Sequence, residues 1–347
     1  MELTREGVLA ALGRVMDPEL AADVASLGMV AGVDTGGGAV RVALAVPGAR
    51  PDDRLAADAA AALRDAGARD VEVTFVEALT FPAQEPLPGV RSIVAVGSGK
   101  GGVGKSTVAA NLAAALAREG LSVGLLDADI YGPSQGKMFG VEGRRLMADE
   151  QKNIVPLRNH GVKVISIANL VEEGQALTWR GPILHGTLTQ LLKQTVWGEL
   201  DVLVVDLPPG TGDVQLSLAQ LVTVTGMVLV TTPQEVALSD VKRAYTMARK
   251  THVPVLGLVE NMSYYPLPGG ERDYLFGEGG ADRWAAEARL DVLGHVPIAR
   301  ALRESGDAGA PLVVTDPADP AALELRRAAR RLLRRVADEA LSSLPMA

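Results

Sequence analysis

The 347-residue sequence contains no cysteine. This absence excludes disulfide bonds, thiol catalysis, and zinc or iron–sulfur centres held by the chain's own thiolates. Histidine is also scarce, and its four residues are widely separated, with no i, i+3 or i, i+4 pair of the kind that ligates a metal from one helix. They are His160, His185, His252 and His295. We assign them no chemistry and interpret them as isolated core or surface residues.

Long apolar runs are missing as well. Hydrophobic residues make up 48% of the chain, yet no uninterrupted apolar stretch reaches the roughly 18 residues typical of a spanning helix. The first twelve or so residues lack the basic flank and apolar centre of a secretory signal. The formal net charge of -8 opposes the phosphate backbone of nucleic acid. These features predict a soluble, cytoplasmic protein with no nucleic acid as its main partner.

Residues 1–79 predict a small α+β domain. An apolar-periodic helix to about Val15 is followed by two short alternating runs around Gly36, Gly37 and Gly38, which is a hairpin signature. A second helix over about 52–66 leads into a strand at 71–78, where apolar and polar residues alternate. The predicted order is therefore α-β-β-α-β.

A proline-rich segment, residues 80–90, is typical of a semi-rigid linker, and residues 91–347 predict a second, larger domain. In the larger domain, short aliphatic runs bounded by turn residues alternate with helical patterns. This alternation predicts an α/β fold with a doubly wound, mostly parallel sheet and with ligands at the carboxyl ends of its strands. The runs are 93–96, 123–126, 162–167, 202–205, 227–230, 255–259 and 292–293.

The first aliphatic run leads directly into a glycine-rich loop. The loop and the residue after it are Gly99, Lys100, Gly101, Gly102, Val103, Gly104, Lys105, Ser106 and Thr107. The pattern G-x-x-x-x-G-K-[ST] between a strand and a helix predicts a phosphate-binding loop, in which glycines let successive N–H groups point at phosphate oxygens. We expect Lys105 to contact the β and γ phosphates, Ser106 to ligate Mg²⁺ and Thr107 to donate to the α phosphate. The alternative is a flexible glycine-rich turn.

An aspartate closes the run at 202–205. Asp206 is the expected Mg²⁺ partner, acting directly or on a metal-bound water, although it could instead cap a turn. Two prolines then stiffen the approach to Gly210, whose backbone N–H is positioned to sense the γ phosphate. This segment is a candidate switch.

Two further aspartates follow the run at 123–126. Hydrolysis needs a group that positions water in line with the γ phosphate, and a carboxylate at a neighbouring strand end can do so. Asp129 is our candidate, and the alternative is that Asp127 and Asp129 only cap local backbone.

Together, these motifs resemble the Mrp/ApbC family of ATPases, within the deviant Walker A class of P-loop proteins that includes MinD and the nitrogenase iron protein. The resemblance spans residues 90 to about 315. It rests on residues 100–107, 127–134, 179–182, 206–213 and 259–263. Residues 1–79 resemble the metal–sulfur cluster assembly domain often fused to such ATPases, through Asp17-Pro18-Glu19 and Ser26-Leu27-Gly28-Met29-Val30.

The resemblance implies roles that the residues alone do not. Lys100 would reach across a face-to-face homodimer to the partner's nucleotide, and Asn261 would contact adenine. The implied task is holding iron–sulfur clusters or delivering them to apoproteins. The sequence has no Asn-Lys-x-Asp guanine motif, which favours ATP as the nucleotide.

This sequence departs from the family at the cluster ligands. Where the family usually has Cys-x-x-Cys, this chain has Tyr264-Tyr265-Pro266-Leu267-Pro268-Gly269-Gly270, and the usual cysteine of the small domain falls near Arg50. Because biological clusters are held chiefly by thiolates, three possibilities remain open. The chain uses unusual ligands, borrows those of an apoprotein or cluster-assembly partner, or has lost the cargo and kept the ATPase.

The C-terminal segment from Pro320 predicts an arginine-rich helix with one apolar face. A MinD-like interpretation makes this helix a reversible membrane anchor for an ATPase that cycles on a surface. We favour a terminal helix docked on the domain, because large anchoring aromatics are absent. The functions left open are therefore a cluster carrier, a surface-cycling ATPase and a cargo-free, nucleotide-switched adaptor.

Overall fold

The computed structural model describes residues 3–17, 22–36, 39–46, 53–77, 87–169 and 181–342. Several residues used in the sequence analysis lie outside these ranges. They are Pro18, Glu19, Gly37, Gly38, Arg50, the predicted linker up to residue 86, and Trp179 and Arg180 of one family motif.

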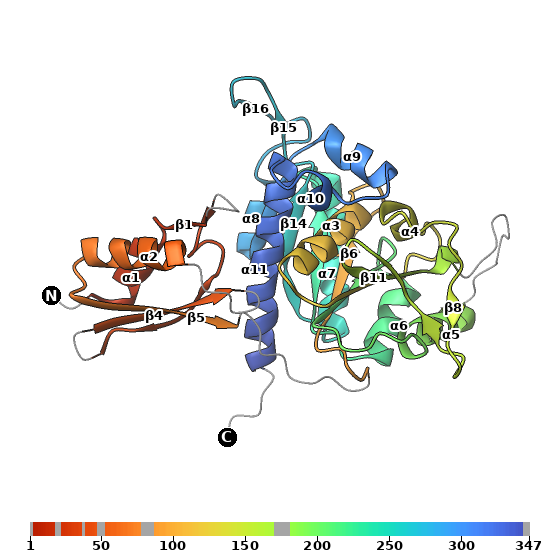
Figure 1. The fold of residues 1–347 in the computed structure, drawn as a ribbon. Coiled ribbons are helices and arrows are strands. Elements are labelled where there is room, and N and C mark those ends of the chain that lie inside the picture. Colours follow the sequence, from red (N-terminus) through yellow and green to blue (C-terminus); the bar gives the residue numbers. More distant parts are fainter. Residues whose placement is uncertain are drawn as a thin grey trace.

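The N-terminal part is a three-stranded sheet covered on one face by two helices (Figure 1). The elements are α1 (Arg5–Leu12), β3 (Val30–Asp34), β4 (Ala39–Val46), α2 (Asp53–Asp65) and β5 (Asp70–Glu77). β4 pairs with β3 antiparallel and with β5 parallel. Alternate residues of β4, such as Val42 and Leu44, are buried against Leu12 and Leu63 of the helices, as expected for a half-covered sheet. A further short pair, β1 (Met16–Asp17) and β2 (Ala22–Asp23), was not predicted.

An eight-stranded sheet organises the larger part of the chain, in the order β10-β11-β7-β12-β6-β13-β14-β17. All neighbours are parallel except β10, which pairs antiparallel with β11 at one edge. The predicted α/β class with a mostly parallel sheet is confirmed. The strands are β6 (Ile93–Ser98), β7 (Val123–Asp127), β10 (Leu157–Asn159), β11 (Val162–Ser166), β12 (Val202–Asp206), β13 (Gly226–Thr231), β14 (Val255–Asn261) and β17 (Val292–Val296).

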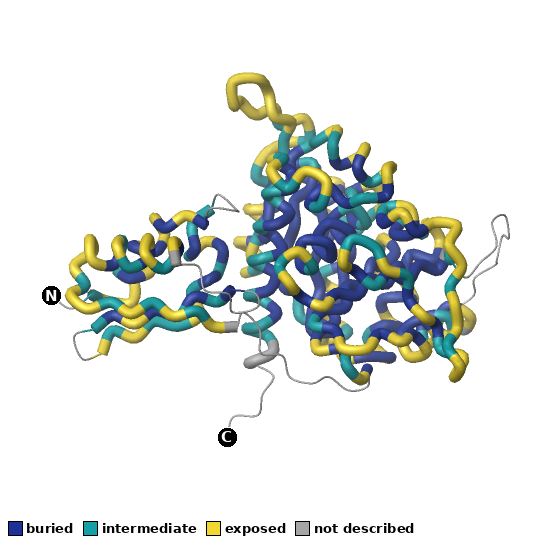
Figure 2. Tube along the Cα trace, in the orientation of Figure 1, coloured by how far each residue is buried: buried dark blue, intermediate teal, exposed yellow. Residues whose placement is uncertain are grey.

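Helices cover both faces of this sheet, which explains why its strands are continuously apolar. Successive residues of β6 belong to opposite cores, because Val94 and Val96 pack on one side and Ile93 and Ala95 on the other. The first face carries α3 (Lys105–Arg118), α10 (Leu312–Thr315) and α11 (Pro320–Ser342). The second carries α5 (Gly181–Lys193), α6 (Asp213–Leu221), α7 (Glu235–Lys250) and α8 (Gly280–Ala288). Figure 2 shows the buried residues concentrated between these layers.

The arginine-rich helix α11 is docked along its length. Its apolar face, including Leu325, Leu332 and Val336, is fully buried against α3 and β17. Several of its arginines pair with carboxylates of the chain, such as Arg330 with Glu119. Among the described helices, none combines the length and the apolar character needed to cross a bilayer.

The N-terminal part lies beside α11 (Figure 1). Arg331 of α11 donates from Nε to the carbonyl of Ser26 at 3.1 Å and from an amino nitrogen to the carbonyl of Leu293 in β17 at 2.7 Å. The N-terminal part therefore contacts the larger part through the C-terminal helix of the latter, which is remote from residues 22–30 in sequence.

Candidate nucleotide-binding site

The glycine-rich loop connects the carboxyl end of β6 to the N-terminus of α3. Gly102 and Gly104 have φ angles of 80° and 81°, in the left-handed region that glycine adopts without strain. Gly104 caps α3 and, having no side chain, offers no acceptor to the free N–H groups of the helix's first turn. The end of α3 is thus open to an anion, with the positive end of the helix dipole directed at it.

Close packing also requires glycine in this loop. A Cβ atom on Gly104 would lie 2.1 Å from Nδ2 of Asn261, and one on Gly99 would lie 2.1 Å from the backbone of Asp240. Asn261 is buried and donates from Nδ2 to the carbonyl of Val103 at 2.9 Å. The end of β14 therefore supports the loop directly.

Lys105 is the centre of the site. Its side chain is buried, and Nζ donates to Oδ1 of Asp206 at 2.5 Å and to Oγ of Ser106 at 3.1 Å. Asp129 Oδ2 lies 3.7 Å from the same nitrogen. The structure thus brings together four of the predicted site residues, which come from β12, α3 and the loop after β7.

Gln135, which the sequence analysis missed, completes this cluster. It is fully buried at the start of α4 (Gln135–Met138) and donates from Nε2 to Oδ2 of Asp206 at 2.7 Å and to the Ser106 carbonyl at 2.9 Å. With Lys105 on one carboxylate oxygen and Gln135 on the other, Asp206 is held in one orientation. No motif signals such an amide, because its importance comes only from the two partners that it joins.

Asp127 holds the loop that carries Asp129. Its carboxylate is fully buried and accepts hydrogen bonds from the backbone N–H groups of Asp129, Ser134 and Gln135 and from the hydroxyl of Ser166. Burial, followed by the nearby charge of Asp206, raises the pKa of Asp127 to about 7, although the hydrogen bonds and Lys105 lower it. Asp127 therefore acts on loop geometry, while the Asp129 side chain reaches Lys105.

A cavity of about 530 Å³ opens beside the loop. Gly104, Thr107 and Asn261 line it on the loop side, and Pro297 and Ile298 line it on the side of β17. Its wall is mainly apolar, and its polar lining includes the charged residues Lys137, Arg303 and Asp307. Such a lining suits a planar base and a sugar next to bound phosphates.

Two predicted residues lie outside this cluster. Gly210 donates its N–H to the carbonyl of Ser98 at 2.8 Å, and the hydroxyl of Ser98 donates to the carbonyl of Lys100 at 3.0 Å. The Lys100 side chain is half-buried and forms no ion pair within the described parts of the chain. Lys100 lies within the loop and Gly210 lies beside it, and neither joins the contacts of Lys105.

An aromatic hairpin projects where the family resemblance placed paired cysteines (Figure 1). It consists of β15 (Tyr265–Pro266) and β16 (Arg272–Asp273), and the Arg272 guanidinium lies 4.3 Å from the ring centre of Tyr264. Across the described residues, no group of three or more His, Cys, Asp or Glu side chains is arranged to hold a metal ion. The described side chains therefore do not fit a thiolate-bound cluster.

Two protein-family models match this chain. The one described as "NUBPL iron-transfer P-loop NTPase" matches residues 89–333, and "Iron-sulfur cluster assembly protein" matches residues 5–75. The first covers more than half of the chain and includes every residue of the site described above.

Individual proteins give the same result. The chain is 49% identical over 344 residues to an iron-sulfur cluster carrier protein of Deinococcus radiodurans, covering 98% of both sequences. A carrier protein of Synechocystis is 43% identical, with 98% of this chain and 99% of that protein covered. A nucleotide-binding protein from Archaeoglobus fulgidus, solved in complex with ADP, has a TM-score of 0.57 and 42% identity, covering 64% of this chain and 87% of that one. The MinD cell division ATPase of Pyrococcus furiosus shares the fold, with a TM-score of 0.54, 23% identity, and 69% and 97% coverage. The chain belongs to the NUBPL iron-transfer P-loop NTPase family, and its full-length relatives are iron–sulfur cluster carrier proteins.

Proposed function

We propose that this protein binds ATP with Mg²⁺ at the end of α3 and hydrolyses it. The observation that carries this proposal is the convergence of Lys105, Ser106, Asp206 and Asp129 beside a helix N-terminus whose cap residue, Gly104, has no side chain. A lone glycine turn would not need two buried carboxylates around one buried lysine.

Each side chain has a distinct task in the proposed reaction. Phosphate oxygens would compete with Asp206 and Asp129 for Lys105, so that the ammonium group passes to the β and γ phosphates. The Ser106 hydroxyl and the Asp206 carboxylate suit Mg²⁺, a hard cation that prefers oxygen ligands and that neutralises developing phosphate charge when bound. Asp129, released from Lys105, would hold the attacking water. Asn261, placed at the cavity beside the loop, would contact the adenine.

We further propose that the active form is a homodimer in which Lys100 contacts the partner's nucleotide. The half-buried position of Lys100 in the loop and its lack of an ion pair among the described residues are compatible with this role. Gly210 would sense the γ phosphate through its N–H, which requires release from the Ser98 carbonyl.

The cellular task that best fits the family is delivery of iron–sulfur clusters to apoproteins in the cytoplasm. Since the chain has no cysteine, the cluster is cargo whose thiolates must come from an apoprotein or an assembly partner. Anaerobic reconstitution with iron and sulfide, with and without a cysteine-bearing candidate partner, tests this. We expect visible absorption and bound iron only with the partner, and no bound cluster under either condition would remove the carrier role.

The second candidate is a nucleotide-switched adaptor without cargo, favoured by the same lack of cysteine. Pull-downs with ATP-loaded and ADP-loaded protein test it, and an unchanged set of partners would contradict it. The apolar face of α11 is buried, so this helix offers no support for an ATPase that cycles on a membrane.

The central proposal is tested by calorimetry with Mg-ATP. We expect Lys105→Ala to weaken binding by about 100-fold or more, because two charge-assisted contacts are lost, each contributing about 1.5–3 kcal/mol. Lys193→Ala, at an exposed position of α5, is the matched control and should bind like the unmodified protein. Equal affinities for the two variants would exclude the loop as the nucleotide site.

A further inference from the structure

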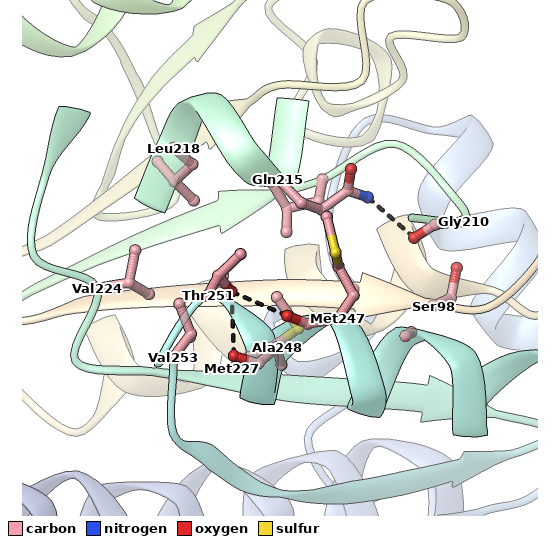
Figure 3. A pocket seen from close by; sticks show the side chains of 14 residues that line it. Ser98, Gly210, Gln215, Leu218, Val224, Met227, Met247, Ala248, Thr251 and Val253 are labelled. Atoms are coloured by element: carbon pink, nitrogen blue, oxygen red, sulfur yellow. Dashed lines mark hydrogen bonds between the residues drawn. The ribbon is translucent and has the colours of Figure 1, made fainter. Parts of the chain in front are cut away.

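Gln215, which was not among the predicted site residues, holds the switch loop, residues 208–212, in place through hydrogen bonds. Gln215 lies in the first turn of α6 and donates from Nε2 to the carbonyls of Pro208 and Gly210, at 3.0 Å each. Figure 3 shows its amide nitrogen directed at the Gly210 carbonyl. Both N–H groups of the amide are therefore used on the residues that flank Pro209.

The amide of Gln215 is held in this orientation although its oxygen is not satisfied. The side chain is buried, with 8% of the residue exposed, and no described residue donates to Oε1. A buried amide oxygen without a partner is unfavourable. The two bonds to the switch loop are thus the interactions that define how this side chain points.

On its other side, the switch loop is joined to the start of the phosphate-binding loop. The Gly210 N–H is bonded to the Ser98 carbonyl, and Ser98 precedes Gly99 directly. Gly210 has a φ angle of 92°, which leaves its backbone free to turn in ways that a side chain would prevent. The N–H of Gly210 can therefore change partner while its carbonyl stays bonded to Gln215.

The space behind Gln215 allows such a movement. A crevice of about 10 Å³, enough for one water molecule, is lined by Ser98, Gly210 and Gln215 and by the flexible side chains of Met227 and Met247 (Figure 3). Methionine is unbranched and adapts to small shifts of its neighbours.

We propose that Gln215 is a positioning residue for recognition of the γ phosphate, an inference that rests on the proposed ATP binding. By holding the carbonyls of Pro208 and Gly210 toward α6, it keeps their negative ends away from the phosphates. The Gly210 N–H can then exchange the Ser98 carbonyl for a γ-phosphate oxygen. ADP lacks that phosphate, so its binding does not depend on Gln215.

Binding of ATP and ADP to the full chain with Mg²⁺, measured by calorimetry for Gln215→Leu, tests this. The matched control is Gln220→Leu, the same substitution at an exposed position of the same helix. We expect Gln215→Leu to weaken ATP binding by about tenfold and to leave ADP binding within about twofold, while the control matches the unmodified protein. Unchanged discrimination between ATP and ADP overturns the inference. If the unmodified protein binds neither nucleotide, the proposed function itself fails.

Gln215→Glu gives a second test that holds even if Gln215→Leu does not fold. An ionised carboxylate cannot donate to the two carbonyls, whereas a protonated carboxyl donates to one of them. Burial beside two carbonyl oxygens raises the pKa of a glutamate at this position above its ordinary value of about 4.3. The ATPase rate of this variant, divided by that of the unmodified protein at each pH, should therefore rise as the pH falls from about 8 to about 5. A ratio that does not depend on pH overturns the assignment.

Discussion

Lys105 lies between two carboxylates that have different tasks in the proposed mechanism. Asp206 is fully buried and held on both oxygens, by Lys105 and by Gln135, so its orientation is set before any ligand enters. Asp129 makes a longer contact of 3.7 Å with Lys105 and lies on a loop held by Asp127. The first carboxylate suits a metal ligand, and the second suits a group that acts on water.

Asp129→Ala separates these tasks. We expect ATP affinity to stay within about threefold, because the phosphate contacts of the loop remain, while the turnover number falls by about 10²–10⁴, the range for loss of a general base. Calorimetry and single-turnover hydrolysis measure the two quantities. Glu150→Ala, an exposed carboxylate, is the control, and normal turnover in Asp129→Ala would refute our assignment of the water-positioning group.

The two left-handed glycines of the loop differ in their surroundings. A Cβ on Gly102 meets nothing within 4 Å, whereas one on Gly104 collides with Nδ2 of Asn261. Both Gly102→Ala and Gly104→Ala pay about 1–2 kcal/mol for the left-handed backbone, but only Gly104→Ala must also break the bond from Asn261 to Val103. We expect Gly104→Ala to lower the free energy of unfolding further than Gly102→Ala, and equal losses in denaturant melts would contradict this packing.

At the scale of elements, β14, β17 and α8 contribute to a charged cluster near the cavity, in which Glu260 is buried and His295 is partly exposed. Glu260 of β14 accepts from the hydroxyl of Ser263, from the N–H of Ala281 at 3.1 Å and from Nδ1 of His295 in β17 at 3.2 Å. The other nitrogen of His295 lies 3.2 Å from Asp282 of α8. The interpretation of all four histidines as isolated is therefore wrong for His295, because the pairing of β14 with β17 places Glu260 opposite it and α8 supplies Asp282.

This cluster predicts a pH dependence of stability. The hydrogen bond with Glu260 raises the pKa of His295 above its ordinary 6.5. Nearby carboxylates raise the pKa further, whereas burial lowers it, and the net shift is upward. Burial opposes the ionised form of Glu260, but the bonds from His295, Ser263 and Ala281 hold the pKa of Glu260 below 4.5. The stabilisation that His295 contributes is thus complete below about pH 6.5 and is lost as the pH rises through the raised pKa of His295. The stabilisation that Glu260 contributes is lost only as the pH falls through the lowered pKa of Glu260.

We therefore expect the free energy of unfolding of the native chain to fall as the pH rises above 6.5, and His295→Gln to remove this component. Urea unfolding at a series of pH values measures it. His185→Gln, on α5, is the matched control and should leave the slope unchanged. Parallel pH profiles for His295→Gln and the native chain would show that the cluster does not titrate in this range.

At the scale of the whole molecule, α11 joins the two parts of the chain. Arg331 bonds to the Ser26 carbonyl in the N-terminal part and to the Leu293 carbonyl in the large sheet, and Glu324 of the same helix accepts from the N–H of His295 at 3.3 Å. One helix thus contacts the N-terminal part, the sheet edge and the charged cluster beside the cavity. This arrangement gives the N-terminal part a defined place next to the P-loop NTPase fold.

Arg331→Ala should loosen that contact. We expect faster amide hydrogen exchange in residues 22–30, by about tenfold if one charge-assisted bond is lost, with little change in the strands of the large sheet. Arg303→Ala, an exposed arginine of α9 (Arg300–Asp307), is the control. Exchange in residues 22–30 that matches the control would mean that other contacts hold the two parts together.

The sequence by itself determined seven of the eight strands of the large sheet and the phosphate-binding loop. Each of the seven aliphatic runs is a strand of the large sheet, because a strand buried on both faces must be continuously apolar. The edge strand β10 was missed, since Leu157–Asn159 is short and partly exposed and carries no such pattern. The loop could be predicted because its chemistry lies in the local backbone, where glycines and a helix end are contiguous in sequence.

Only the tertiary structure decided which distant groups meet. Asp206 reaches Lys105 because β12 lies beside β6 in the sheet, and Gln135 and His295 gain their partners in the same way. Gln215 could not be predicted either, although its partner Gly210 is only five residues away in sequence. The direction of the Gln215 amide depends on how α6 packs against the switch loop. Strand order and side-chain direction are properties of the packed core, and a linear pattern of residues does not contain them.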